Sequence, residues 1–520
     1  MKTRMSVFIL QAGRLRRVLL VFLAVLVVHF ISGSCFSGPF EQSSSQAGNR
    51  VVSYPAVSTA VKSSSYTVSV NGVSVFTEQY KDIHYVHFAF TGMADIVVTA
   101  GSDIKSYTLS PESYGIQSKV EGRRLSFTIA EPGKLVVRMN NGQRLCLFAD
   151  PIENDPSKLG DSKLVNIMAF GLDNTGETLE TERIQKAVDS IEKGGVLYLP
   201  PGIYSTGTLR LKSNMTLYLA AGAMLKGAAG AESYPSDSIG RRLLMIAEAM
   251  NVTITGRGII DGNGAAVRAS GEKAHLLTLK NSSDILIEGI FLRESASWNT
   301  HILCCDRVTI RNIKMINDVA LSNTDGFDPD SSSDVLIEDS FIYAGDDAVA
   351  VKTSNRGKLL RDLVNNTFRN NVVMTQKSAL KVGTETRGGR MTKISFLNNQ
   401  VIQSDRGMAI YCNDGADISD VQFIGNHFEG NYPDSKRRMI DFKITNRDGA
   451  GLIRNILIKN CSFSKPFPRK STIEGLDAGH TIQGVVFQNF SIAGKMCRNA
   501  KEAQLETGAF VEDITFTTTR

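Results

Sequence analysis

Three stretches decide the fold: DILIEGI at residues 284–290, RVTIRNI at residues 307–313 and DVLIEDS at residues 334–340. Each starts with a polar residue, continues as an alternating apolar strand, and turns at Gly, Asn or Asp. The same plan recurs from residues 251, 393, 420 and 454, with a period of about 23 to 35 residues and no helical pattern between units. Such a unit exposes an apolar face that only a stacked neighbour can cover.

Stacking of these units predicts an all-β fold, a right-handed parallel β-helix over residues 163–520. A β-propeller is the alternative, but it requires a period of roughly 40–50 residues. Residues 182–193 predict one amphipathic helix, because four apolar side chains share a face and Gly194-Gly195 follows it. We expect this helix to cover the first coil of the solenoid.

A different pattern precedes the solenoid, at residues 51–152. Short alternating strands such as YTVSV at 66–70 and HYVHFAF at 84–90 are separated by Gly, Pro, Asn and Ser. This pattern predicts a small N-terminal β-sandwich. A polar segment up to residue 162 then separates the two regions.

The first 35 residues are typical of an export signal. Five Lys and Arg residues precede an unbroken apolar run at 18–28, and small residues lead to Cys35. The run is shorter than the roughly 20 apolar residues that span a bilayer. We therefore expect a secreted protein or one attached in the periplasm or outer envelope. Cys35 is the candidate for a lipid anchor, and residues 36–50 are expected to form a linker.

Charge and cysteine content argue against two classes of function, nucleic-acid binding and zinc binding by cysteines. Nearly all of the net charge of +6 lies in the signal, so there is no electrostatic case for nucleic-acid binding. None of the seven cysteines has zinc-ligand spacing. We interpret them as small buried side chains, with one disulfide at most. A monomer is expected, since a long β-helix covers its own ends.

Two acidic segments carry the candidate chemistry: SNTDGFDPDS at 322–331 and YAGDDAVAVK at 343–352. Asp325 and Asp346 are 21 residues apart, about one short coil, so their carboxylates can lie side by side. Strand alternation would turn either Asp346 or Asp347 inward, unless a bend at Gly345 lets both face outward.

Crowded carboxylates raise one another's pKa, which keeps one group protonated near neutral pH. Glycoside hydrolysis needs this pairing of a protonated acid with an ionised base. Asp325, Asp346 and Asp347 are therefore the predicted catalytic residues. Ordinary turn chemistry and a calcium site are the other interpretations of these segments.

The motifs NTDG at 323–326 and GDD at 345–347 resemble the signatures of glycoside hydrolase family 28, the polygalacturonases, and of its clan relative family 49, the dextranases. GVLYLPPGIY at 195–204, GRGIIDGNG at 256–264 and SWNTH at 297–301 are also similar to that family. The resemblance implies an inverting hydrolase of a pectin-type polysaccharide or oligosaccharide, with no metal or other cofactor. It implies that Asp346 is the general acid and that Asp325 and Asp347 activate water.

Two departures from the family concern substrate recognition. Residues 377–385 contain no Gly-His-Gly motif, and Ala409 and Tyr411 replace the basic residues of an Arg-Ile-Lys motif that grips a uronate carboxylate. Lys352, Lys381, Arg387 and Arg406 could supply the missing positive charge. The predicted substrate-binding residues are Asn323, Trp298, His301, Lys352, Lys381, Glu385, Arg406 and Tyr411.

Three other functions remain open at this point. The chain could hydrolyse a neutral or sulfated glycan such as dextran. It could be a polysaccharide lyase, although a lyase usually needs a basic residue that abstracts a proton. It could also be a non-catalytic glycan-binding β-helix, which would have no reason to keep mutually repelling carboxylates.

Overall fold

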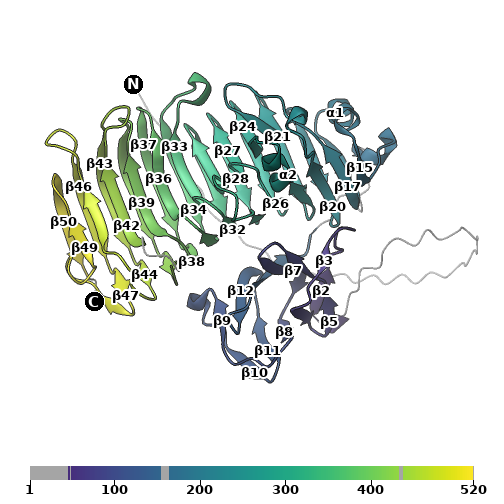
Figure 1. The fold of residues 1–520 in the computed structure, drawn as a ribbon, viewed down its shortest axis with the longest axis horizontal. Coiled ribbons are helices and arrows are strands. Elements are labelled where there is room, and N and C mark those ends of the chain that lie inside the picture. The colour runs from purple at the N-terminus through teal and green to yellow at the C-terminus, as the bar shows by residue number, and fades with distance from the viewer. Residues whose placement is uncertain (1–44, 47, 154–162, 432–436, 519–520) are drawn as a thin grey trace, which may run out of the picture. The chain divides into compact units, whose positions relative to one another are not determined.

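The computed structural model describes residues 45–46, 48–153, 163–431 and 437–518. A strand-rich N-terminal region is followed by a solenoid of stacked coils, whose parallel strands succeed one another from teal to yellow in Figure 1. The predicted signal at residues 1–35, including Cys35, lies outside the described residues. No helix in the described part of the chain is long and apolar enough to cross a membrane.

The N-terminal region contains two sheets that enclose one apolar core. The strands of one sheet are β1 (Ser45–Gln46), β2 (Asn49–Ser53), β3 (Val61–Lys62), β6 (Thr77–Tyr80), β7 (Ile83–Thr91), β9 (Tyr107–Ser110), β12 (Gly133–Met139) and β13 (Arg144–Pro151). Those of the other are β4 (Tyr66–Val70), β5 (Val73–Val75), β8 (Ala94–Ala100), β10 (Ser118–Glu121) and β11 (Arg124–Ile129). Buried side chains such as Val68, Phe88 and Leu147 pack between them, as in the predicted sandwich.

Three long sheets form the right-handed parallel β-helix. The first contains β14 (Leu164–Asn166), β16 (Gly195–Leu199), β19 (Met215–Leu219), β22 (Met250–Gly256), β25 (Ser283–Glu288), β28 (Asp306–Arg311), β31 (Ser333–Glu338), β34 (Leu363–Arg369), β37 (Arg390–Leu397), β40 (Asp417–Ile424), β43 (Leu452–Lys459), β46 (Ile482–Gln488) and β50 (Val511–Thr517). The second contains β15 (Thr175–Leu179), β17 (Gly202–Thr206), β20 (Ala223–Gly227), β23 (Ile259–Asp261), β26 (Phe291–Arg293), β29 (Lys314–Ile316), β32 (Phe341–Ala344), β35 (Val372–Thr375), β38 (Gln400–Gln403), β41 (His427–Phe428), β44 (Ser462–Phe463), β47 (Ser491–Ile492) and β48 (Lys495–Met496).

The third sheet carries the candidate chemistry. Its strands are β18 (Leu209–Leu211), β21 (Arg241–Ala247), β24 (Ala274–Lys280), β27 (Thr300–Leu303), β30 (Phe327–Asp330), β33 (Val349–Thr353), β36 (Ser378–Thr386), β39 (Arg406–Cys412), β42 (Arg438–Ile444), β45 (Ser471–Glu474) and β49 (Leu505–Thr507). Each strand pairs in parallel with the equivalent strand of the next coil. Residues one coil apart in sequence therefore become direct neighbours across the sheet.

The turn that joins the first sheet to the second explains the repeated Gly, Asn and Asp. One residue there has a left-handed backbone, a conformation that these residue types adopt most readily. The residues in this position are Gly289, Asn312, Asp339, Asn370, Asn398, Gly425, Asn460 and Asn489. The repeated plan in the sequence is therefore a chain of identical corners.

Ordered ladders fill the interior of the solenoid. Asn399 is fully buried, and its side chain bonds both to Asn426 of the next coil and to the backbone of Phe368. Phe396 stacks between Phe368 and Phe423, with ring centroids 5.0 Å away on each side. The cysteines in the described part of the chain are all buried and unpaired, as the small-side-chain interpretation predicts.

Helix α1 (Thr181–Ser190) packs Ile184, Ala187 and Val188 into the solenoid core beside its first coils. It ends three residues earlier than the predicted helix at 182–193. The reason lies in Ile191, which takes an extended conformation and still keeps its side chain in the core. The only other α-helix in the described residues is α2 (Gly264–Ala269).

The sandwich and the second sheet of the solenoid share an apolar core. Val136, Cys146 and Phe148 of the sandwich belong to the same buried cluster as Phe291 and Phe341 of the solenoid. Because both regions contribute to this cluster, neither can bury its apolar surface alone.

A buried ion cluster lies beside this apolar contact. Asp150, with no exposed surface, accepts a hydrogen bond from Lys314 of the solenoid. Its carboxylate also lies 2.9 Å from Nε2 of His87, 3.3 Å from Nε of Arg257 and 3.5 Å from Nζ of Lys134. A carboxylate from the sandwich is thus compensated by cations from both regions.

Candidate active site

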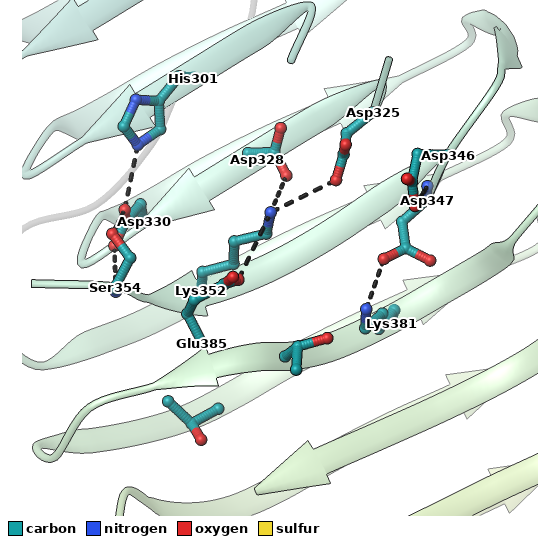
Figure 2. A network of polar contacts seen from close by, with 12 residues as sticks. His301, Asp325, Asp328, Asp330, Asp346, Asp347, Lys352, Ser354, Lys381 and Glu385 are labelled. Atoms are coloured by element: carbon teal, nitrogen blue, oxygen red, sulfur yellow. Dashed lines mark hydrogen bonds and ion pairs between the residues drawn. The ribbon is translucent and has the colours of Figure 1, made fainter. Parts of the chain in front are cut away.

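The three aspartates selected from the sequence meet at the third sheet, on two adjacent coils. Asp325 lies two residues before β30, and Asp347 lies two residues before β33. Phe327 pairs with Val349 across these strands, so Asp325 and Asp347 occupy equivalent positions one coil apart. One carboxylate oxygen from each of Asp325, Asp346 and Asp347 lies within 4.8 Å of the others (Figure 2).

A bend at Gly345 explains how both Asp346 and Asp347 reach the same pocket. A Cβ atom at Gly345 would lie 2.4 Å from Oγ1 of Thr324, so only glycine fits there. The carboxylate of Asp346 accepts hydrogen bonds from the N–H of Asp347 at 3.0 Å and from the N–H of Asn323 at 3.3 Å. The bend breaks the strand alternation that would have turned one carboxylate inward.

Lys352 lies at the centre of a second group of carboxylates (Figure 2). Its ammonium is 2.8 Å from Asp328, 3.4 Å from Asp325 and 3.7 Å from Glu385. Burial, only partly offset by Lys352, raises the pKa of Asp325 well above its usual value and raises that of Asp328 to about 6. One lysine therefore interacts with two buried carboxyl groups, and the surroundings of both favour the protonated form.

Asp346 and Asp347 differ in proton affinity although they are adjacent. Burial, and then the negative charge of Asp347, raises the pKa of Asp346. Burial would also raise the pKa of Asp347, but its ion pair with Lys381 and the N–H donated by Ser378 at 2.9 Å lower it below the usual value. Asp346 thus keeps its proton at a pH at which Asp347 is ionised, the division that acid–base catalysis requires.

These carboxylates line a pocket of about 400 Å³. Its wall includes five of the predicted substrate-binding residues, namely Asn323, Trp298, Lys352, Lys381 and Glu385. It also includes residues that the sequence had not singled out, among them Arg241, Lys273, His275, Arg356 and Thr384. A larger groove of about 880 Å³ lies between the sandwich and the first sheet, and none of the three aspartates lines it.

The remaining predicted residues have partners elsewhere and do not line the pocket. His301 is fully buried, with Nε2 3.0 Å from the carboxylate of Asp330. Arg406 lies 3.3 Å from Asp441, and the hydroxyl of Tyr411 donates a hydrogen bond to the same carboxylate. In this structure the three side chains hold neighbouring coils together.

Trp298 offers no free face to a sugar ring. Its side chain is 6% exposed. The Lys352 ammonium lies 3.6 Å from the centre of the ring system, and the Arg356 guanidinium carbon lies 4.2 Å from it. The contacts support a packing role for Trp298, in which the ring holds two cations in place.

The clustered aspartates also have the spacing of a candidate cation site. Calcium takes roughly six to eight oxygen ligands. Here Lys352 and Lys381 already compensate Asp325 and Asp347. The arrangement therefore favours proton transfer between carboxyl groups and substrate over calcium binding.

Comparison with known proteins agrees with this geometry. The family model described as Glycosyl hydrolases family 28 matches residues 198–463. A probable polygalacturonase of Vitis vinifera is 34% identical over 36% of this chain and 44% of its own length. An exo-poly-alpha-D-galacturonosidase of Dickeya chrysanthemi is 25% identical over 47% of this chain and 51% of its own. The chain therefore spans about half the length of these curated relatives.

Two solved structures share the fold. Dex49A from Penicillium minioluteum aligns with a TM-score of 0.62 at 14% identity, over 92% of this chain and 100% of its own. An exopolygalacturonase from Thermotoga maritima aligns with a TM-score of 0.54 at 20% identity, over 69% of this chain and 92% of its own.

Proposed function

Because the chain belongs to family 28 of the glycosyl hydrolases, we propose that it hydrolyses glycosidic bonds of a pectic polysaccharide or oligosaccharide that contains galacturonate. The observation that carries this proposal is the set of three aspartates within 4.8 Å, in which the pKa of Asp346 is raised and that of Asp347 is lowered. The polygalacturonases among the relatives support the substrate class.

In the proposed mechanism, Asp346 donates its proton to the glycosidic oxygen that leaves. Asp347, ionised beside Lys381, accepts a proton from the water that attacks the anomeric carbon. Asp325 occupies the equivalent position one coil away and holds the same water from the other side. Substrate binding excludes solvent from this buried group, which strengthens each of these charge interactions.

We propose inversion at the anomeric carbon, although the carboxylates are close together. Inverting enzymes commonly separate acid and base by about 6.5–9.5 Å, which leaves room for water between them. Here the water would lie between Asp325 and Asp347 instead, and Asp346 would approach from the side. Proton NMR of the first product formed tests this step, and a product with the configuration of the substrate would contradict it.

A lyase mechanism is less compatible with the site. Although burial opposes it, the carboxylates of Asp328, Asp325 and Glu385 raise the pKa of Lys352 well above its usual value. Lys352 therefore stays protonated and cannot act as the base that abstracts a proton from a uronate. Lys381 is held in an ion pair with Asp347.

The decisive experiment is a reducing-sugar assay on polygalacturonate, rhamnogalacturonan, dextran, pullulan and a sulfated galactan. We expect activity on a galacturonate-containing polymer, and a loss of about 10²- to 10⁴-fold in kcat for Asp346→Asn. Asp103→Asn, an exposed change in the sandwich, is the matched control. Activity restricted to dextran or pullulan would instead establish a hydrolase of neutral glycans. Full activity of Asp346→Asn would remove the proposed acid.

We further propose that the protein is exported and acts on plant cell-wall material as a monomer. The export signal and Cys35 support the first part. Mass spectrometry of the protein isolated from its native envelope would show either cleavage near residue 35 or a lipid on Cys35. Light scattering after gel filtration tests the monomer.

A further inference from the structure

We propose that Arg356 forms a carboxylate-binding subsite in the active-site pocket and selects substrates with an acidic sugar at that position. The inference rests on the proposed function and adds to it the residue that takes over from the missing Arg-Ile-Lys motif. Its ligand class is a hexuronate, bound through the carboxylate on C5.

The first argument is a census of positive charges. Each of the four cations suggested by the sequence already has a carboxylate partner. These cations are Lys352, Lys381, Arg387 and Arg406. Arg356 lines the pocket, and within the described residues no carboxylate lies within 4.0 Å of its guanidinium. Its guanidinium is therefore not compensated by an ion pair, whereas Lys273, the other such cation of the pocket, already donates a hydrogen bond to Oδ1 of Asn323 at 2.9 Å.

The second argument is that Arg356 is held in place before substrate arrives. Its guanidinium lies over the Trp298 ring at 4.2 Å. Its backbone N–H donates to Oγ of Ser354 at 3.3 Å, and the N–H of Ser354 donates to the buried carboxylate of Asp330 at 2.8 Å. Fixing the side chain in advance lowers the entropy cost of binding a ligand.

The third argument is that the loop carrying Arg356 packs against a second loop. Ile239 lies in one buried apolar cluster with Leu303 and Cys304, and Leu359 packs against that cluster. A Cβ atom on Gly357 would lie 3.0 Å from the side chain of Ile239, so the two loops are in close contact. This contact fixes the position of Arg356 relative to the wall formed by Gly240 and Arg241.

Arg356 lines the same pocket as the three aspartates. Lys352 and Arg356 contact the same Trp298 ring, and Lys352 is 3.4 Å from Asp325. A sugar placed at the aspartates can therefore direct a substituent towards the guanidinium. The planar guanidinium matches a carboxylate with two parallel N–H donors, whereas a hydroxymethyl group offers no charge to bind.

The test measures binding, so that it does not depend on turnover. In an Asp346→Asn background, calorimetry compares trigalacturonate with the neutral α-1,4-galactotriose for Arg356, Arg356→Gln and Arg356→Lys. We expect Arg356→Gln to weaken trigalacturonate about tenfold or more, with unchanged affinity for the neutral sugar. Arg356→Lys should recover part of the loss, because it keeps the charge without the planar donor pair.

Arg307→Gln is the matched control, because Arg307 is exposed and pairs with Asp284 on the first sheet. Equal losses for both sugars would overturn the proposal, since they would mean that Arg356 only supports Trp298. Undiminished trigalacturonate binding by Arg356→Gln would also overturn it, as would the absence of such binding when Arg356 is intact. Arg356-dependent binding without hydrolysis of any galacturonate polymer would uphold the subsite and reject the proposed function.

Discussion

Replacing Lys352 by Met tests whether one buried ammonium holds the carboxylates of Asp325 and Asp328 together. The Lys352 side chain is 4% exposed, and Asp325 and Asp328 are 3% and 0% exposed. Met keeps the apolar stem but leaves two carboxylates buried without their cation. Breaking a buried ion pair by removing one partner costs about 3–5 kcal/mol. Because these side chains are almost fully buried, solvent screening does not reduce that cost.

A double-mutant cycle separates this charge effect from lost packing. Asp328→Asn in the Lys352→Met background removes a carboxyl that must otherwise stay ionised without a cation or take up a proton, so we expect it to recover about 2 kcal/mol or more above pH 6. Urea unfolding followed by tryptophan fluorescence and by far-ultraviolet circular dichroism measures each variant. Trp298 is the only tryptophan and contacts Lys352, so fluorescence reports the site while dichroism reports the coils.

Two results would refute this reasoning. The first is a Lys352→Met variant within about 1 kcal/mol of the parent protein, a value expected for a surface ion pair. The second is a double variant no more stable than Lys352→Met alone. Either result would mean that Lys352 contributes by packing on Trp298 and not by compensating charge.

Three further predictions concern other parts of the molecule. Lys381→Met should raise the pKa of Asp347, so the acidic limb of the kcat/KM profile should move to higher pH; an unchanged limb would assign it to another group. Phe396→Ala should cost about 3–5 kcal/mol in urea unfolding, since the fully buried ring stacks on both sides; a cost under 1 kcal/mol would contradict close packing. Burial raises the pKa of Glu429 from 4.5 to about 7, so this carboxyl binds a proton in the folded protein that it loses in the unfolded chain. Its contribution to stability should be present below pH 4.5 and lost as pH rises to about 7, and Glu429→Gln should flatten that decline in a series of melting curves.

The solenoid could be predicted from the sequence because its repeating unit is local. Alternation within each strand and a Gly, Asn or Asp at each left-handed corner are visible over seven residues. The same locality placed Asp325 one coil from Asp346. What could not be predicted was the end of the helix at Ser190, because Ile191 stays in the core without helical geometry.

The ion-pair partners of the charged side chains could not be predicted from the sequence. Lys352 and Lys381 were candidates for substrate carboxylates, but acids 24 to 34 residues away neutralise them. Asp328 could have been found from its place in the acidic motif, since it lies three residues after Asp325. Arg356 had no such signal, because its position depends on how two loops meet over Trp298.

The contact between the sandwich and the solenoid has a consequence for protein engineering. In a shortened protein that begins at residue 163, Phe291 and Phe341 would be exposed to solvent, and Lys314 would lose its ion pair with Asp150. Tyr343 would also lose its hydrogen bond to Asp82. Tyr343 lies on β32, the strand that leads directly into the bend bearing Asp346. We therefore expect the solenoid alone to be prone to aggregation and to leave Asp346 without this support, so the sandwich is better treated as part of the framework of the site than as an exchangeable module.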